Sequence, residues 1–227
     1  MEEPLPQLET RDGKLFLVGE AGAICAEFLS GPMGYRTAKG GGRGQAVARA
    51  VGLKAGRAIP RVADLTTGLG RDAFLLATLG CPVLALERHA MIHALCADGL
   101  ARAEACRDPE TPAVDLCLVH ADALSALRAW PEGPLASFQP DVLYLDPMHP
   151  PRKKSALPRK EMRLFRALVG EDLDQTELLH AALQAPVQRV VVKRPAAYPP
   201  LLEGVVSAVG GKTTRFDLYL PKGPGRA

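Results

Sequence analysis

Two acidic residues, each followed by turn-forming residues, could carry chemistry in this chain. Asp146 is followed by Pro147 and comes directly after the apolar run 141–145, whereas Asp64 lies within a shorter apolar run, four residues before Gly68. A carboxylate beside a proline carbonyl can accept both hydrogens of an exocyclic amine, whose lone pair is otherwise delocalised into its ring. Asp146 and Pro147 are therefore candidate catalytic residues for a reaction at such an amine.

The residues after Asp64 form a glycine-rich turn that opens a helix. Gly68 and Gly70 have no Cβ, so the backbone can turn tightly there and approach a ligand closely. The pattern Gly68-x-Gly70-x-x-Ala73 also matches the dinucleotide-binding motif, so the glycines alone leave both NAD and S-adenosylmethionine open. Asp64 favours S-adenosylmethionine, because a carboxylate suits an amino group better than a pyrophosphate. A turn that binds nothing is the structural alternative.

Two further acids follow predicted strands. Glu87 follows the apolar run 82–86, about twenty residues after the glycines, where a carboxylate accepts hydrogen bonds from ribose hydroxyls. Asp122 follows the strand predicted over 116–119. It could accept a hydrogen bond from an adenine amino group, or cap the helix predicted over 123–130.

The positions of these residues require an α/β fold. From Pro60 onward strands and helices alternate, which predicts a mostly parallel sheet covered on both faces, with an antiparallel closing strand over 214–220. Asp146 then ends a buried strand at the carboxyl edge of the sheet, where open α/β proteins bind ligands. We expect a Rossmann-like class I methyltransferase domain over residues 59–227.

Residues 1–58 do not share this alternation and are predicted to form a small N-terminal subdomain. A strand is predicted over 14–18, a short apolar element over 26–29 and a helix over 46–51. The segment Tyr35–Gln45 is rich in glycine and carries three basic side chains. We expect it to be a loop that is either a simple linker or a cover for a polyanion or cofactor.

Composition indicates a soluble globular protein. The 227 residues are 47% hydrophobic and 23% charged, with no apolar run long enough to span a bilayer and no export signal, so we expect a cytoplasmic protein. The five cysteines are scattered without a C-x-x-C pair, which predicts no structural zinc and a reducing compartment. Cys81 and Cys117 are interpreted as small core residues.

Positive charge is concentrated after Asp146. Residues 152–166 carry seven Lys or Arg and one Glu, a net charge of +6, whereas the whole chain carries +3. Such a cluster is commonly a solvated helix face, but its place beside the candidate site favours a surface that grips the phosphates of a nucleic acid. Arg36, Arg43 and Lys193 could face either RNA or cofactor. The residues predicted to contact RNA are Arg43, Arg152, Lys153, Lys154, Arg159, Lys160, Arg163 and Lys193.

Several motifs together resemble one family, the small-subunit (16S) ribosomal RNA guanine-N2 methyltransferases known as RsmJ. The resemblance covers most of the chain from about residue 35 onward. The triple-glycine loop and the Lys-Ser-Ala-Leu tract are specific to this family. The matching segments are 40–45, 68–74, 86–88, 144–148, 154–157, 160–163 and 190–195.

The resemblance implies methylation of the exocyclic N2 of one guanosine in 16S rRNA, with S-adenosylmethionine as the cofactor and 16S rRNA or the small ribosomal subunit as the partner. It places His149 where the family usually has Phe, so that an imidazole would stack on the target base. With Asp146 and Pro147 it completes the catalytic set. The cofactor-binding residues predicted from the motifs and the resemblance are Asp64, Gly68, Gly70, Arg71, Asp72, Glu87, Arg88, Asp122, Ala123 and Asp146.

Two other functions remain open at the level of sequence. The first is an NAD(P)-dependent oxidoreductase, because of the glycine pattern. The second is a non-catalytic RNA-binding ribosome-assembly factor that uses the basic cluster alone. We expect no metal and no membrane partner, and the sequence does not predict an oligomeric state.

Overall fold

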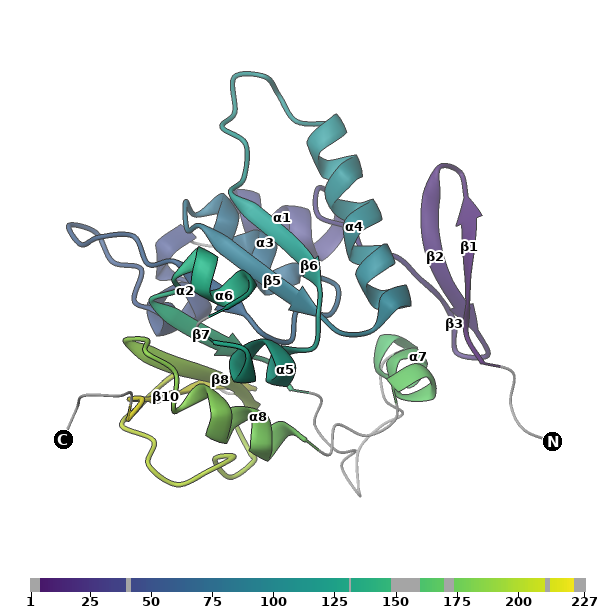
Figure 1. The fold of residues 1–227 in the computed structure, drawn as a ribbon. Helices are drawn as coiled ribbons and strands as arrows, with labels where there is room; N and C mark the ends of the chain where they lie inside the picture. The colour runs from purple at the N-terminus through teal and green to yellow at the C-terminus, as the bar shows by residue number, and fades with distance from the viewer. Residues whose placement is uncertain are drawn as a thin grey trace.

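A seven-stranded sheet forms the centre of the molecule (Figure 1). The computed structural model describes residues 5–39, 42–130, 132–147, 160–169, 174–210 and 213–222. The strand order is β6-β5-β4-β7-β8-β10-β9. The strands are β4 (Val62–Asp64), β5 (Val83–Glu87), β6 (Leu116–His120), β7 (Val142–Leu145), β8 (Arg189–Pro195), β9 (Ser207–Gly210) and β10 (Thr214–Tyr219).

The five strands from β6 to β8 run parallel, and β10 runs antiparallel to both β8 and β9. Every residue of β4, β5 and β7 is buried, because helices cover both faces of the sheet and leave the strands little access to water. The predicted α/β fold with its antiparallel closing strand is therefore confirmed.

The order of the strands fixes where a ligand can bind. From β4 the chain proceeds outward through β5 and β6, and then returns to the other side of β4 to form β7 and β8. The connections therefore diverge at the carboxyl ends of β4 and β7, and this divergence leaves a crevice. Asp64 is the last residue of β4, and Asp146 directly follows β7.

Helices pack on the two faces in two separate apolar clusters. One cluster contains residues of α1, α2, α3, α4 and α7, and the other contains residues of α5, α6 and α8. The helices are α1 (Gly31–Lys39), α2 (Ala46–Val51), α3 (Arg71–Thr78), α4 (Ala90–Ala105), α5 (Ala123–Arg128), α6 (Pro134–Phe138), α7 (Lys160–Val169) and α8 (Gln175–Ala182), with a 3₁₀ turn η1 (Gly42–Gly44).

A small antiparallel sheet precedes the large one and lies beside α4 and α7 (Figure 1). Its strands are β1 (Gln7–Arg11), β2 (Lys14–Gly19) and β3 (Gly22–Ile24). The strand predicted over 14–18 is confirmed, whereas the apolar element expected over 26–29 has no regular structure and β3 precedes it. The domain boundary between residues 58 and 59 stays a prediction.

The expected loop over Tyr35–Gln45 is wrong in its first half, because α1 continues to Lys39. Tertiary contacts stabilise this helix despite its two glycines. Met33 is only 4% exposed in the core, and the Arg36 guanidinium pairs with Asp72 of α3 at 2.7 Å. The glycine content predicted a loop here, but contacts with the core and with α3 hold the segment as a helix.

The two cysteines interpreted as core residues have different environments. Cys81 is fully buried, as predicted, whereas Cys117 is exposed. The interpretation of Cys117 was wrong because β6 is an edge strand, so alternate residues on it face solvent.

Candidate functional site

A cavity of about 260 Å³ opens at the carboxyl ends of β4, β5 and β7. It is lined by the glycine turn, by the residues that end these strands, and by side chains of α4, α5, α7 and α8. Most of the predicted cofactor-binding residues lie on its wall, namely Asp64, Gly68, Arg71, Asp72, Glu87, Arg88, Asp122, Ala123 and Asp146. The strand order thus brings together acids that are up to 82 residues apart in the sequence.

The two glycines of the turn have different roles. Both have left-handed backbones, with φ of +57° at Gly68 and +74° at Gly70. A Cβ on Gly70 would lie 2.6 Å from the Cys96 sulfur, so this glycine allows α3 to pack closely on α4. A Cβ on Gly68 would meet only Phe165, at 3.7 Å, and Gly68 lines the cavity. The missing side chain of Gly68 therefore leaves space for a ligand.

Glu87 connects the glycine turn to the end of β5. Its Oε2 accepts a hydrogen bond from the Gly68 N–H at 2.9 Å, and its Oε1 accepts one from the His89 N–H at 2.7 Å. The residue is 8% exposed. The carboxylate is thereby fixed on the cavity wall, and a carboxylate is a suitable acceptor for ribose hydroxyls.

Asp64 is an acid held in the interior, 2% exposed. Burial raises the pKa of its carboxyl well above the ordinary value, although the Thr66 N–H donates to its Oδ1 at 3.1 Å, and the nearby carboxylates of Asp72 and Asp146 raise this pKa further. A cation in the cavity would relieve this electrostatic cost. The arrangement suits the amino group of an amino acid.

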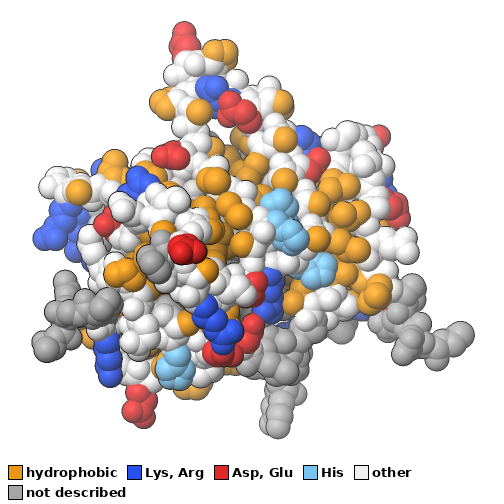
Figure 2. All heavy atoms as spheres, viewed as in Figure 1, with side chains coloured by type: hydrophobic (Ala, Val, Ile, Leu, Met, Phe, Trp, Pro, Cys, Tyr) orange, Lys and Arg blue, Asp and Glu red, His pale blue; other side chains and the backbone are white. Residues whose placement is uncertain are grey.

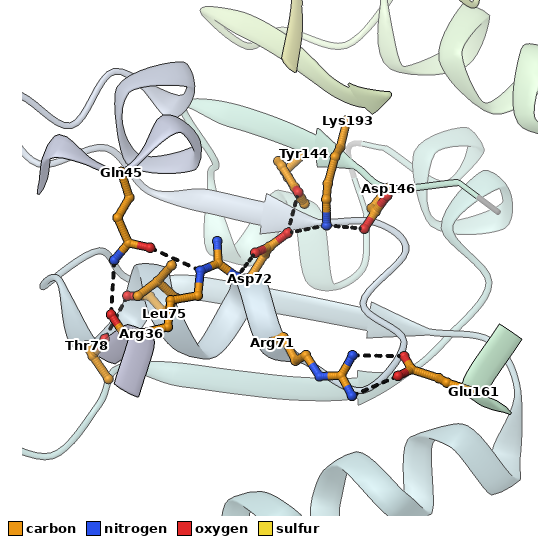
Figure 3. Close-up of polar contacts among 10 residues, drawn as sticks. All are labelled: Arg36, Gln45, Arg71, Asp72, Leu75, Thr78, Tyr144, Asp146, Glu161 and Lys193. Atoms are coloured by element: carbon orange, nitrogen blue, oxygen red, sulfur yellow. Dashed lines mark hydrogen bonds and ion pairs between the residues drawn. The ribbon is translucent and has the colours of Figure 1, made fainter. Parts of the chain in front are cut away.

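Asp72 is the centre of a charged network beneath the cavity (Figure 3). Its Oδ1 accepts from Arg36 at 2.7 Å, and its Oδ2 accepts from the Tyr144 hydroxyl at 2.7 Å and from Lys193 Nζ at 2.8 Å. The same ammonium lies 2.6 Å from Oδ2 of Asp146. Two carboxylates of the site are thus joined through a single lysine.

The network sets the charge of its members. Burial by itself would raise the pKa of Asp72, but Lys193 and Arg36 outweigh burial and hold the pKa far below its ordinary value. Burial would lower the pKa of Lys193, but Asp146 and Asp72 raise it above its ordinary value. Both groups are therefore ionised at neutral pH.

Several members of this network escaped the sequence analysis. Tyr144 lies in a run that reads as apolar core, yet a buried tyrosine hydroxyl usually has a hydrogen-bond partner, which was the available signal. Arg36 was left open between RNA and cofactor; it lies instead beside Asp72, with its Nε donating to Gln45 Oε1 at 3.0 Å. The short-range pattern contains no signal for Gln45.

Asp146 and Pro147 directly follow β7 and line the cavity. The Asp146 N–H donates to the Thr66 hydroxyl oxygen at 2.7 Å, which ties this turn to the residues after β4. The Asp146 side chain is 36% exposed, and Lys193 contacts its Oδ2. Among the described residues, no hydrogen bond reaches its Oδ1. His149, the third predicted catalytic residue, lies outside the described residues.

Two of the other predicted cofactor contacts have partners within the protein. Asp122 caps α5 by accepting from the Ser125 N–H at 2.8 Å, as the structural alternative proposed, and it also lines the cavity with Ala123. Arg88 pairs with Asp174 at 2.7 Å across the cavity edge. Roles for these residues in binding stay predictions.

Helix α7 closes one side of the cavity. Its Met162 and Phe165 side chains line the wall, and its Glu161 forms a two-pronged ion pair with Arg71, with contacts of 3.0 and 2.8 Å (Figure 3). Arg71 was predicted to bind cofactor. The structure shows that its guanidinium also holds α7 against the start of α3.

Four of the predicted RNA-contacting residues lie in the described part of the chain, namely Arg43, Lys160, Arg163 and Lys193. Figure 2 shows Lys and Arg side chains in separate small groups on the face viewed. Arg43, Lys160 and Arg163 are exposed, whereas Lys193 faces Asp72 and Asp146. The remaining four, Arg152, Lys153, Lys154 and Arg159, lie outside the described residues.

The cavity suits an amino-acid-bearing nucleoside. It offers buried carboxylates at Asp64 and Glu87, and free space at Gly68. Apolar side chains that could flank a purine ring lie between them, namely those of Leu69, Ile92, Leu124 and Phe165. This combination of carboxylates, apolar walls and a glycine cradle fits S-adenosylmethionine.

Comparisons with known proteins agree with this chemistry. Residues 7–221 match the family described as "Putative SAM-dependent methyltransferase". The ribosomal RNA small subunit methyltransferase J of Chromobacterium violaceum is 47% identical over 211 residues, which cover 92% of this chain and 80% of that protein. The chain belongs to the ribosomal RNA small subunit methyltransferase J family. The same-named protein of Aeromonas salmonicida is 51% identical over 203 residues, covering 88% of this chain and 78% of the relative.

A solved structure of a SAM-dependent methyltransferase has a similar fold. The crystal structure of a SAM-dependent methyltransferase from Neisseria gonorrhoeae has a TM-score of 0.71 and 36% identity, and the match covers 100% of this chain and 87% of that one. Membership of the methyltransferase J family decides between the two cofactors that the glycine pattern left open, in favour of S-adenosylmethionine. It also makes this chain an enzyme rather than a non-catalytic RNA-binding factor.

Membrane-spanning helices and metal sites are both absent from the described residues. None of the helices there is long and apolar enough to cross a membrane. In the same part of the chain, no group of three or more His, Cys, Asp or Glu side chains could hold a metal ion.

Proposed function

We propose that this methyltransferase J family member transfers a methyl group from S-adenosylmethionine to the exocyclic N2 of a guanosine in 16S rRNA. The observation that carries the proposal is the position of Asp146 and Pro147 on the cavity wall, with Oδ1 of Asp146 accepting no hydrogen bond from a described residue. The names of the relatives support small-subunit rRNA as the substrate.

Asp146 and Pro147 would hold the acceptor amine. The carboxylate Oδ1 and the Pro147 carbonyl oxygen each accept one N2 hydrogen, which turns the nitrogen lone pair out of the ring and toward the cavity. When bound, S-adenosylmethionine supplies an electrophilic methyl group on a positively charged sulfur. Positioning of this kind is worth about 7–11 kcal/mol in well-oriented systems. No strong base is required, because the surplus N2 proton can leave after transfer.

The remaining site residues would hold the cofactor. Asp64 would face the amino group, Glu87 the ribose hydroxyls, and Asp122 with Ala123 the adenine edge, while the glycine turn admits the ligand to the cavity. Arg71 and Arg88 would support the walls through their ion pairs with Glu161 and Asp174.

The target guanine must reach the cavity from an RNA chain. We propose that it is unstacked or already single-stranded, with His149 stacking on its ring. The basic residues predicted from the sequence, other than Lys193, would hold the flanking phosphates, with the cytoplasm as the site of action. Of these residues, Lys160 and Arg163 lie on α7, the helix that also walls the cavity.

The test uses methyl-labelled S-adenosylmethionine, purified protein, and either 16S rRNA or small subunits that lack the modification. The RNA is digested and the labelled nucleoside identified, with Asp146→Ala as the matched control. Label in N2-methylguanosine, absent in the control, supports the proposal. Label in another nucleoside overturns the guanosine assignment, and a protein that binds the cofactor but labels neither RNA substrate overturns the rRNA assignment.

A further inference from the structure

Lys193 lies between two acids of the site and touches both. Its Nζ is 2.6 Å from Oδ2 of Asp146 and 2.8 Å from Oδ2 of Asp72, and its side chain is 28% exposed (Figure 3). It projects from β8, which pairs with β7 in the sheet. Asp146 directly follows β7. The sequence analysis had placed this lysine among the RNA contacts.

The ammonium is held by a hydrogen-bonded framework centred on Asp72. Asp72 is 6% exposed, and its two oxygens accept hydrogen bonds from Arg36, Tyr144 and Lys193. Arg36 is fixed in turn by Gln45, whose Nε2 donates to the Arg36 carbonyl at 3.3 Å. Helices α1 and α3 and strand β7 thus determine where the ammonium lies.

We propose that Lys193 is a positioning residue for methyl transfer, which holds Asp146 ionised and turned so that Oδ1 faces the acceptor amine. The inference rests on the proposed role of Asp146. By occupying Oδ2, Lys193 leaves Oδ1 to accept the hydrogen of the substrate, and a carboxylate anchored at one oxygen has lost most of its freedom to rotate.

The charges around Asp146 explain why Lys193 is needed to keep this carboxyl ionised. The titratable groups that face the Asp146 carboxyl are Asp64, Asp72, Tyr144, Glu161 and Lys193. Burial raises the pKa of Asp146, the carboxylates of Asp72 and Glu161 raise it further, and Lys193 opposes them. A protonated Asp146 would be a weaker acceptor for the substrate amine, and its own proton would compete for the acceptor site.

The same charges argue against a phosphate contact. Lys193 already pairs with Asp72 and Asp146, so an RNA phosphate approaching the ammonium would also meet two carboxylates. Arg163 offers a contrast on the same molecule, because it is exposed on α7. The ammonium of Lys193 is thus used in ion pairs with Asp72 and Asp146.

The test compares Lys193→Met and Lys193→Arg with the exposed control Lys54→Met and with Arg163→Met as a phosphate-contact control. For Lys193→Met we expect kcat at pH 7 to fall about 100-fold, because misplacement of a reacting group by about 1 Å has this effect. The acid limb of the pH profile should move to higher pH, while the KM for RNA stays unchanged. Lys193→Arg keeps a cation between the acids and should restore the position of the acid limb.

The pKa of Asp146 can be measured in the protein without cofactor or RNA. This measurement tests the role of Lys193 independently of the proposed function. In a carbon NMR titration of the Asp carboxyl groups, with Asp146 assigned from Asp146→Asn, the Asp146 pKa should be higher in Lys193→Met than in the wild type. Circular dichroism verifies that each variant folds. If Lys193→Met does not fold, the pH profile and the Asp146 pKa are measured in Lys193→Arg instead.

Three results would overturn the inference. The first is an Asp146 pKa that is unchanged in Lys193→Met. The second is a rise in the KM for RNA with a salt slope lower by about one, as expected for Arg163→Met and for any lost phosphate contact. The third is an equal loss of kcat in Lys193→Arg and Lys193→Met with no movement of the acid limb. Failure of the proposed function appears instead in the wild type, as label missing from guanosine.

Discussion

The N–H of Gly68 donates to Oε2 of Glu87 across 2.9 Å, so the glycine turn after β4 and the acid that ends β5 form one hydrogen-bonded unit. Glu87 also accepts from the His89 N–H. The acid that is proposed to bind the ribose therefore also shapes the turn that admits the cofactor. Binding and local stability are coupled at this residue.

Replacing Glu87 with Ala should weaken both properties. The change leaves the N–H groups of Gly68 and His89 without their acceptor, which costs about 1–3 kcal/mol of unfolding free energy, and removes the partner for the ribose. Urea unfolding and calorimetric titration with S-adenosylmethionine measure the two effects. Glu203→Ala, at an exposed position, is the control. Wild-type stability in Glu87→Ala would contradict the structural role.

The two glycines of the turn should respond differently to alanine. Gly70→Ala combines a left-handed backbone with a clash against Cys96 and should cost about 2–5 kcal/mol. Gly68→Ala should cost only about 1–2 kcal/mol, but its methyl group would occupy the cavity and weaken cofactor binding. Gly56→Ala isolates the backbone cost, since its φ is +73° and nothing lies within 4 Å. A larger loss of stability at Gly68 than at Gly70 would show that these roles are reversed.

Asp64→Asn should stabilise the protein while weakening cofactor binding. Because the folded-state pKa of Asp64 is raised, its contribution to stability is greatest when it is protonated and is lost as pH rises from about 4 toward that pKa. The Tm of the variant should therefore exceed that of the wild type at pH 7, by roughly 2–4 °C for each kcal/mol, and converge with it below about pH 4.

Thermal unfolding across pH and calorimetric titration with S-adenosylmethionine examine both halves of the Asp64 prediction. The asparagine oxygen can still accept from the Thr66 N–H, so the turn is retained. A lower Tm at pH 7 together with unchanged cofactor affinity would mean that Asp64 is a structural residue.

Asp146→Ala should separate binding from turnover. Loss of the carboxylate removes an acceptor for the substrate amine, and kcat should fall by at least about 100-fold. The affinity for S-adenosylmethionine, measured by calorimetry, should change little. Asp146→Asn keeps one carbonyl oxygen but loses the negative charge, so its kcat should lie between those of wild type and Asp146→Ala. Normal turnover in Asp146→Ala would rule out the proposed mechanism.

The Arg71–Glu161 ion pair should act on cofactor affinity through α7. The side chains are 49% and 27% exposed, so a coupling of only about 0.5–1 kcal/mol is expected, a twofold to fivefold change in Kd. Arg71→Ala and Glu161→Ala should weaken binding equally, and the double variant should add no further loss. A much larger effect of Arg71→Ala would indicate that Arg71 contacts the cofactor directly.

Sequence alone was sufficient for the large sheet and for the acids that follow its strands. Runs such as 82–86 and 141–145 are apolar because parallel strands are covered on both faces, and this signal is local. The carboxyl ends of parallel strands meet at one edge, so Asp64, Glu87 and Asp146 could be placed together before any coordinates were known. Strand alternation and motif spacing carry this information within a few residues.

Tertiary structure decided which side chains these acids contact. Lys193 lies 121 residues from Asp72 and 47 from Asp146 in the sequence, and no local pattern shows that its ammonium lies between them. The helix at α1, the closure of the cavity by α7 and the exposure of Cys117 likewise depend on packing between distant segments. Burial and charge pairing are properties of the folded arrangement. The sequence alone gives the charge of a basic residue, but only the structure shows which acids it contacts.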